Sequence, residues 1–548
     1  MTTRVLLLVS ITGSLWAQGR GGPPAPPPLA SPKVTFDRIL NANQEPQNWL
    51  TYGGSPTSQR HSLLTQITPD NAKNLELKWV FQAKTIEKEE ATPLVVNGVM
   101  YTIQSPNDVI ALNAETGKPL WTYPHKPDAA GRNCCGRLSR GLAIEGDTLF
   151  LGTLDARMIA IDAKTGKELW NTQAADPKDG YAFTHAPIVV KDKVIAGTAG
   201  GEFGVRGWIA AWDIKTGKEV WRFYTVPGPG EPGHETWSGD SWLHGGAPVW
   251  VTGSYDPEAN LTYWGVGNPG PDWDGDARLG DNLYSCSVIA LDPDTGKLKW
   301  YYQFSPHNEF DWDATQTPVL ADMEYQGKQR KVMMWANRNG MAYLLDRTTG
   351  EFLRGGPFTK VNWATGFDEK GRPMRDPKVT PTKEGTLVYP GNQGGTNWYP
   401  PSYSPHTGLF YIPTWQNSSS IYSKGEAPPE FHDGQTFSGP FPRNTTTQDD
   451  QYSSVQAIDP KTGARKWEFR MASPRTDAGI LTTASDVLFS GGTDGQFFAL
   501  DARDGKLLWQ QNALGSSVAA GPMSYMVNGR QYVSVTVGSS LYTFGLKQ

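Results

Sequence analysis

A short pattern of apolar and polar residues recurs along most of the chain. In each copy an apolar run leads to an Asp or Asn, then to a turn containing Thr-Gly or Asp-Gly, and then to a second run that ends in a large residue. Because Asp starts turns through its side chain and Gly adopts positive φ, each copy predicts a β-hairpin. Seven copies are found, with turn glycines at Gly117, Gly166, Gly217, Gly296, Gly350, Gly463 and Gly505.

The spacing of these turns predicts the number of repeated units. Most neighbouring turn glycines are about 42 to 79 residues apart, whereas Gly350 and Gly463 are 113 apart. The long interval predicts one degenerate copy, which we place at "SYSPHTGLFYIPTW", 402–415. Eight units with tryptophan docking motifs predict an all-β fold, an eight-bladed β-propeller. We expect the strand at 75–83 and the last strands, at 531–546, to complete one blade and close the ring.

The N-terminal residues predict export from the cytoplasm. One basic residue, Arg4, precedes an apolar run and the small residue Ala17, as in a secretory signal peptide over residues 1–17. Residues 18–35 are rich in Pro and Gly, which predicts an extended, unpacked tether, and residues 36–548 are expected to form the propeller domain. No other stretch approaches the ~20 apolar residues of a membrane span. We therefore expect a periplasmic protein without a membrane span; the alternative is that the apolar run is a buried first strand.

Charge excludes one class of partner. The formal net charge is −5 and the chain has no long Lys/Arg block, so no basic footprint for nucleic acid is present. The 60 glycines, 42 prolines and 21 tryptophans fit many tight turns and aromatic anchors. These anchors explain packing and leave open whether the propeller is an enzyme or a binding scaffold.

Several polar residues are not required by the repeat. They are Glu202 in a glycine-dense segment, Asn268 after a strand, the pair Asp311 and Asp313, and Arg338 before Asn-Gly. Residues two apart in an extended segment point to one side, so the two aspartates can face one cation. Glu, Asn and Asp are hard oxygen ligands, which suit an oxygen-preferring cation rather than zinc. Taken singly, such acids are more often solvated turn residues.

Taken together, these segments resemble the PQQ-dependent quinoprotein alcohol dehydrogenases, the methanol and ethanol dehydrogenase family. The resemblance extends from about residue 40 to the end, and "GGEFGVRGWIAAWD" is similar to the ethanol-type branch. That family has an eight-bladed propeller with tryptophan docking motifs, in agreement with the repeat.

The resemblance implies roles for individual residues. Glu202, Asn268 and Asp311 match the family's metal ligands, and Asp311 also matches its catalytic base. Arg338 matches the residue beside the reactive carbonyl, and Trp250 the ring that stacks on the quinone. The matches to the PQQ-binding residues are Glu90, Arg140, Thr184, Gly200, Gly201, Trp250, Arg338, Asn397 and Trp398.

Cys134 and Cys135 are adjacent, and they are two of only three cysteines in the chain. In the family such a pair forms a disulfide ring against one face of PQQ, and the resemblance implies the same here. The alternative is a pair of reduced thiols packed in a blade. The third cysteine, Cys286, lies in an apolar strand and is expected to be buried and unpaired.

The resemblance also bears on the metal and the substrate. Asp313 resembles an extra aspartate of the lanthanide-dependent members, and since an added carboxylate suits a trivalent ion, a lanthanide(III) is favoured over Ca²⁺. The alternative is a solvated loop acid. Pro248, Val249 and Asp477 depart from the family pattern, which leaves the shape of the substrate pocket open.

The implied activity is oxidation of a small alcohol to an aldehyde. The metal polarises the quinone C5 carbonyl, Asp311 accepts the hydroxyl proton, hydride passes to C5, and Arg338 stabilises the oxygen that gains charge. Since no C-x-x-C-H haem motif is present, a separate acceptor such as a soluble cytochrome c is expected. A homodimer is compatible with the sequence, and the polar insertion at 417–451 is expected to form a lid or channel rim. The alternative function is a cofactor-free propeller scaffold of the outer-membrane assembly type.

Overall fold

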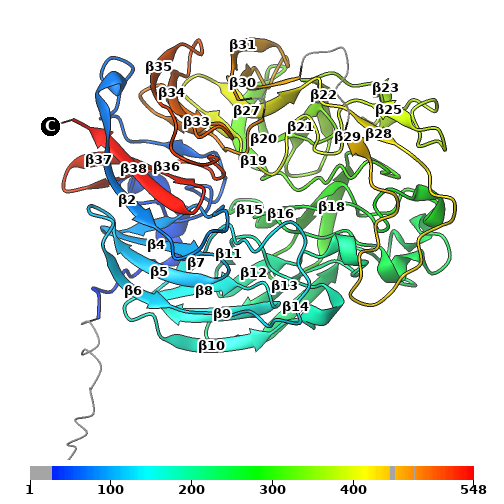
Figure 1. Ribbon diagram of the computed structural model, residues 1–548, viewed down its shortest axis with the longest axis horizontal. Helices are drawn as coiled ribbons and strands as arrows, with labels where there is room; N and C mark the ends of the chain where they lie inside the picture. The colour runs from blue at the N-terminus through cyan, green and yellow to red at the C-terminus, as the bar shows by residue number, and fades with distance from the viewer. Residues whose placement is uncertain (1–27, 445–450, 474, 548) are drawn as a thin grey trace, which may run out of the picture.

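The computed structural model describes residues 28–444, 451–473 and 475–547. Within these residues, eight antiparallel sheets stand around one axis as the blades of a propeller (Figure 1). This architecture confirms the predicted fold class.

The strands of each blade follow one another from the axis outwards. The first four blades consist of β3 (Leu94–Val96), β4 (Val99–Gln104), β5 (Asp108–Asn113) and β6 (Pro119–Tyr123); β7 (Ala143–Glu145), β8 (Thr148–Gly152), β9 (Arg157–Asp162) and β10 (Glu168–Gln173); β11 (Ile188–Val190), β12 (Lys193–Gly197), β13 (Trp208–Asp213) and β14 (Glu219–Tyr224); β15 (Ser254–Asp256), β16 (Leu261–Gly265), β17 (Ser287–Leu291) and β18 (Leu298–Gln303). The other four consist of β19 (Val319–Tyr325), β20 (Lys328–Ala336), β21 (Met341–Asp346) and β22 (Phe352–Pro357); β26 (Ser402–Ser404), β27 (Leu409–Gln416), β30 (Tyr452–Ile458) and β31 (Arg465–Arg470); β32 (Leu481–Thr483), β33 (Val487–Gly491), β34 (Phe497–Asp501) and β35 (Leu507–Gln511); β36 (Met523–Val527), β37 (Arg530–Val537), β38 (Ser540–Leu546) and β2 (Leu75–Gln82).

Large side chains lock each blade to the next at the predicted turns. A Cβ atom on Gly166 would lie 2.6 Å from the Trp121 ring of the preceding blade, and the φ of Gly166 is +71°. Only glycine satisfies both the left-handed backbone and the close ring contact. The Trp121 indole N–H also donates to the carbonyl of Ala163. At Gly463 the contacting side chain is Arg354 instead of a tryptophan.

One detail of the repeat prediction is wrong. The stretch 402–415 is not a separate unit, because β26 and β27 pair with β30 and β31 in a single blade that contains Gly463. The long interval instead holds additional segments between β22 and β30, namely β23 (Ala364–Phe367), β24 (Pro373–Arg375), β25 (Thr386–Val388), β28 (Ser420–Tyr422) and β29 (Arg443–Asn444). The eighth unit is the blade formed by both ends of the chain.

That closing blade is as predicted. β2 pairs antiparallel with β38, from Leu75 opposite Leu546 to Gln82 opposite Ser540. Backbone hydrogen bonds between the two ends of the chain therefore close the ring.

A segment over residues 47–62, which we call the axial segment, bonds to the innermost strands of several blades. The backbone N–H groups of Tyr255, Leu320 and Tyr403 donate to the carbonyls of Pro56, Thr57 and Gln59. β1 (His61–Ser62) then pairs parallel with β32. Before it lie α1 (Phe36–Leu40) and η1 (Ala42–Gln44), and after it η2 (Ala72–Asn74). One stretch of chain thus connects blades that are far apart in sequence.

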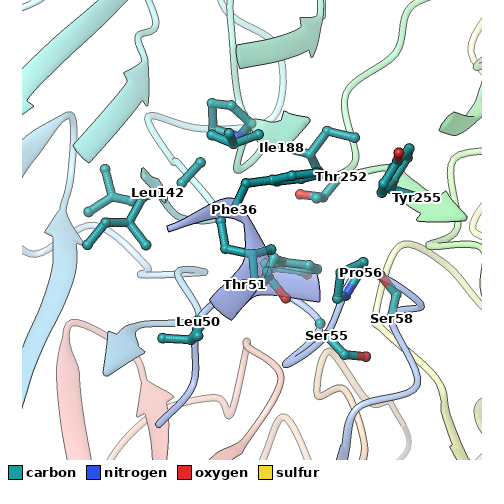
Figure 2. Close-up of a pocket in the computed structure, with 18 residues that line it drawn as sticks. Phe36, Leu50, Thr51, Ser55, Pro56, Ser58, Leu142, Ile188, Thr252 and Tyr255 are labelled. Atoms are coloured by element: carbon teal, nitrogen blue, oxygen red, sulfur yellow. The ribbon is translucent and has the colours of Figure 1, made fainter. Parts of the chain in front are cut away.

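A small apolar cavity lies beside the axial segment. Its volume is about 40 Å³, and Phe36, Leu142, Ile188 and Tyr255 are among its lining residues (Figure 2). Because its walls lack converging charged groups, it is a packing void rather than a site of chemistry.

The leader predictions lie mostly outside the described residues. Residues 1–17 and the first ten residues of the tether fall there. For residues 28–35 the prediction of an unpacked tether is wrong, because Val34 is fully buried and pairs with Gly146 of the second blade. No helix in the described ranges is long and apolar enough to cross a membrane.

Residues 424–441 form a segment that we call the strap. It runs between β28 and β29 (gold in Figure 1) and packs on two loops, which carry η4 (Gly201–Phe203) and η7 (Gly275–Ala277). The other short helices are η3 (Pro177–Asp179), η5 (His234–Thr236) and η6 (Ser241–His244).

Candidate active site

A polar cavity of about 250 Å³ lies among the loops at one end of the propeller. Glu90, Arg140, Thr184 and Trp250 precede the innermost strands of the first four blades, and all four line the cavity. Loops that enter an innermost strand lie at the same end of the ring as loops between second and third strands, such as that of Glu202. The blade topology therefore gathers residues from separate repeats around one space.

The cavity brings together most of the residues singled out in the sequence. Thirteen of the fifteen line it: Glu90, Cys134, Cys135, Arg140, Thr184, Gly200, Glu202, Trp250, Asp311, Asp313, Arg338, Asn397 and Trp398. The other two, Gly201 and Asn268, do not line the cavity. They lie against each other, because a Cβ on Gly201 would be 2.9 Å from Asn268 Oδ1.

Arg140 joins two sides of the cavity. Its guanidinium lies 2.9 Å from a carboxylate oxygen of Glu90. It also stacks on the rings of Trp250 and Trp398, at 4.9 and 4.3 Å from their centroids. These contacts hold two flat aromatic walls and an ion pair in a fixed arrangement.

The adjacent cysteines form a disulfide. Cys134 and Cys135 are bonded to each other, and Cys286 is free and buried, as expected. Both bridged sulfurs and a Glu202 carboxylate oxygen lie within 4.8 Å of one another. Since thiolates are the metal-binding form of cysteine, bridged sulfurs leave the carboxylate as the metal-ligating group of this trio.

Arg338 bridges the two aspartates. Its guanidinium nitrogens lie 3.2 Å from Asp311 and 2.6 Å from Asp313. Between the aspartates, Trp312 is fully buried and its indole N–H donates to the carbonyl of Gly391. With Trp312 turned into the core, both carboxylates face the cavity. The segment is not a regular extended strand, because Asp311 has a φ of +57°.

Burial shifts the titration of these carboxyls. Burial raises the pKa of Asp311 to about 8, although Arg338 opposes the shift. It also raises the pKa of Glu202 to about 7 and that of Asp313 above its ordinary value. A bound cation would stabilise the ionised form of these clustered, buried carboxyls.

One acidic residue next to the cavity was missed in the sequence. Asp272 is 1% exposed, and its carboxylate accepts a hydrogen bond from the Asn268 side-chain amide. Burial raises its pKa well above the ordinary value. In the sequence "NPGPDWDGD", no local feature distinguishes Asp272 from Asp274 and Asp276. Only the fold shows which of the three points inward.

Lys88 was missed as well. Its ammonium lies 3.0 Å from Glu90 and 3.4 Å from Asp477. Asp477 also accepts a hydrogen bond of 2.9 Å from the Tyr399 hydroxyl, and all four residues line the cavity. Of the three positions that depart from the family pattern, Asp477 is the one that reaches the cavity, whereas Pro248 and Val249 do not.

Comparisons with known proteins agree with this site. The PQQ family model, described as the β-propeller domain of glucose, ethanol and alcohol dehydrogenases, matches residues 49–361. Quinohemoprotein alcohol dehydrogenase ADH IIB of Pseudomonas putida is 40% identical, over 93% of this chain and 76% of its own. The chain belongs to the PQQ-dependent alcohol dehydrogenase family.

Three further comparisons bear on this dehydrogenase. A protein of Thauera butanivorans named 1-butanol dehydrogenase (cytochrome c) is 40% identical, over 89% of this chain and 74% of its own. The solved structure of a europium-containing methanol dehydrogenase superposes with a TM-score of 0.88 at 34% identity, covering 93% of this chain and all of that one. A family model for the outer membrane protein assembly factor BamB matches residues 451–547. The membership makes the chain an alcohol-oxidising enzyme and sets the scaffold alternative aside.

Proposed function

We propose that this dehydrogenase works in the periplasm, binds PQQ in the cavity and oxidises small alcohols to aldehydes with the help of one cation. The observation that carries the proposal is the convergence of Glu202, Asp311, Asp313 and Arg338 on the cavity that the disulfide and Trp250 also line. Carboxyl groups, a guanidinium and flat walls therefore surround one space.

The residues present fit a flat, anionic quinone. The Nε groups of Arg140 and Arg338 are buried and find no hydrogen-bond partner among the described residues. Lys88, Arg132 and Arg475 also line the cavity. Cationic donors without a full set of partners suit the carboxylates of PQQ. Trp250, Trp398 and the disulfide supply rigid walls for its rings.

The oxygen donors fit a cation. Glu202, Asn268, Asp311 and Asp313 would hold it, and three of these four are carboxylates whose ionisation burial opposes. Three negative charges favour a trivalent ion, so we favour a lanthanide over Ca²⁺. The europium in the similar methanol dehydrogenase supports this choice.

When bound, the quinone would supply a two-electron hydride acceptor and the cation a Lewis acid. Asp311 would accept the proton of the alcohol hydroxyl at its carboxylate. Arg338, which contacts Asp311, would hold that carboxylate in place and donate to the oxygen that gains negative charge. The walls would exclude water and orient the alcohol carbon.

The electrons would pass to a separate acceptor, and we propose a soluble cytochrome c. The name of the similar 1-butanol dehydrogenase supports this acceptor. A homodimer stays a prediction.

The test is Asp311→Asn, which preserves shape but cannot act as a base. Alcohol turnover with PQQ, La³⁺ or Ca²⁺ and an artificial acceptor should fall about 100-fold or more, while quinone absorbance shows PQQ still bound. Asp477→Asn is the matched control, since it removes the same charge from the same cavity. Normal turnover in Asp311→Asn with PQQ bound would refute the assignment of the base.

A further inference from the structure

The side-chain amide of Asn268 can bind a cation through only one of its two polar groups. Its carbonyl oxygen is a ligand, whereas its NH₂ group is a donor that a cation repels. Asn268 is 1% exposed, so hydrogen bonds to bulk water do not determine which of the two amide orientations it adopts. Neighbouring protein groups must fix the orientation of this amide.

The main chain of Asn268 is anchored on both sides. Its N–H donates to the Asp313 carboxylate, and its carbonyl accepts from Ala247 at 2.7 Å. These hydrogen bonds fix the main chain of Asn268. They still allow the side-chain amide to flip, which exchanges the positions of its oxygen and its NH₂ group. Their contribution to the orientation of the amide is therefore indirect.

Asp272 bonds to the amide itself. The Asn268 NH₂ group donates to Asp272 and, at 3.4 Å, to the carbonyl of Pro269. The opposite end, Oδ1, then borders Gly201, next to Glu202. In this contact the Asp272 carboxyl oxygen is the acceptor and the NH₂ group is the donor, so Asp272 holds the NH₂ end of the amide.

Arg278 holds Asp272 in this place. Arg278 is fully buried, and it donates to the main-chain carbonyls of Pro271 and Asp272, both at 3.0 Å. It also donates to the carbonyl of Asn308, at 2.6 Å. The loop that carries Asp272 is thereby tied to the segment that leads to Asp311.

We propose that Asp272 is a positioning residue of the cation site: by accepting from the Asn268 NH₂ group, it keeps the amide oxygen turned toward the cation. This inference rests on the metal site of the proposed function. It adds a residue that does not line the cavity and would not touch the cofactor.

The experiment measures cation affinity rather than turnover. Tb³⁺ binding to the purified full chain is followed by tryptophan-sensitised luminescence, with La³⁺ as competitor. Asp272→Ala should weaken binding about 10- to 100-fold, the usual effect of removing a group that orients a ligand. Asp272→Asn should lose less, because its amide oxygen still accepts. PQQ absorbance should not change.

A second background separates orientation from charge or folding. In Asn268→Asp both ends of the side chain are oxygens, so orientation no longer matters, and adding Asp272→Ala or Asp272→Asn should not weaken Tb³⁺ binding. Asp274→Ala is the matched control: it removes an acid two residues away whose side chain accepts from Ala277, and affinity should stay within about twofold.

Equal losses in both backgrounds, or wild-type affinity in Asp272→Ala, would overturn the inference. If Asp272→Ala does not fold, Asp272→Asn decides, with several-fold loss expected when Asn268 is intact and none in the Asn268→Asp background. Absence of Tb³⁺, La³⁺ and Ca²⁺ binding to the wild type would overturn both the metal site and this inference. A turnover failure alone leaves the binding comparison intact.

Discussion

The immediate neighbours of a residue determine whether its side chain faces the cavity. Asp311 and Asp313 face it together because Trp312 is buried between them, with its indole N–H bonded to Gly391. Asp311 has a φ of +57°, a left-handed conformation that Asp tolerates better than most residues. The spacing of two was readable in the sequence, and so was the resulting pair of carboxylates.

The second aspartate should decide the preferred cation. Asp313→Asn removes one negative charge, which lowers affinity for La³⁺ more than for Ca²⁺, because a trivalent ion gains more from each carboxylate. We expect the ratio of La³⁺ to Ca²⁺ affinity to fall about tenfold, measured by competition with Tb³⁺. In Asp477→Asn the ratio should stay near the wild-type value. An unchanged ratio in Asp313→Asn would contradict the lanthanide preference.

Cation binding should strengthen as the pH rises. Burial raises the pKa of Asp311 from 3.8 to about 8 and that of Glu202 from 4.5 to about 7. The stability that proton binding gives the cation-free protein is fully present below about pH 4 and is lost as the pH rises through these two values. A cation competes with these protons.

Calorimetric titration with Ca²⁺ at about pH 6 and about pH 8 tests this, since binding should be weaker and release more protons at the lower pH. The rise in melting temperature on adding the cation should likewise be larger at the higher pH. Equal affinity at both values would show that the carboxyls are already ionised in the cation-free protein.

At the scale of elements, the strap covers the loop that carries Glu202. The backbone N–H of Phe437 donates to the Glu202 carbonyl at 2.7 Å. A Cβ on Gly204 would lie 3.0 to 3.1 Å from the rings of Phe437 and Phe431. Phe431 also stacks on His244, with ring centroids 3.4 Å apart. The strap thus packs directly on the loop that carries Glu202, a predicted metal ligand.

Removing both rings should loosen that loop. In Phe431→Ala/Phe437→Ala we expect faster hydrogen exchange over residues 200–204 and about tenfold weaker Tb³⁺ binding, because the loop must then be ordered by the cation itself. Phe441→Ala is the control, since Phe441 belongs to the same strap, is 71% exposed and contacts Trp273 instead. Unchanged exchange in the double variant would show that the strap does not hold the loop.

At the scale of the whole molecule, the axial segment connects the blades at the centre. Arg60 is fully buried, and it donates to the carbonyls of Tyr52, Ile480 and Pro522, at 3.3 Å or less. These acceptors come from the axial segment and from two blades near the C-terminus. One side chain therefore joins the beginning of the fold to its end.

Replacing Arg60 should destabilise the entire ring. Arg60→Met keeps most of the volume but leaves three buried carbonyls without this donor, which should cost about 3 kcal/mol or more. Thermal unfolding followed by calorimetry measures the change. Arg503→Met, at a side chain that is 59% exposed, should change stability by less than about 0.5 kcal/mol. Similar melting temperatures for both variants would rule out a central role for Arg60.

The repeat in the sequence determined the blade pattern and the closing blade, and the resemblance to the family named thirteen of the residues around the cavity. Hairpin turns and docking rings depend on short, repeated spacings, so local patterns are enough to reveal them. The placement of the degenerate copy failed because an inner hairpin and an inserted segment carry the same turn signals as a new blade.

Only the tertiary structure decided the rest. Which of Asp272, Asp274 and Asp276 turns inward depends on the folded loop that Arg278 ties to Asn308. Where the strap lies and how the axial segment joins the blades depend on contacts between residues more than a hundred positions apart, such as Phe437 with Glu202 and Arg60 with Ile480. No local spacing records such contacts, because they form when the closed ring brings loops of separate blades to the same end.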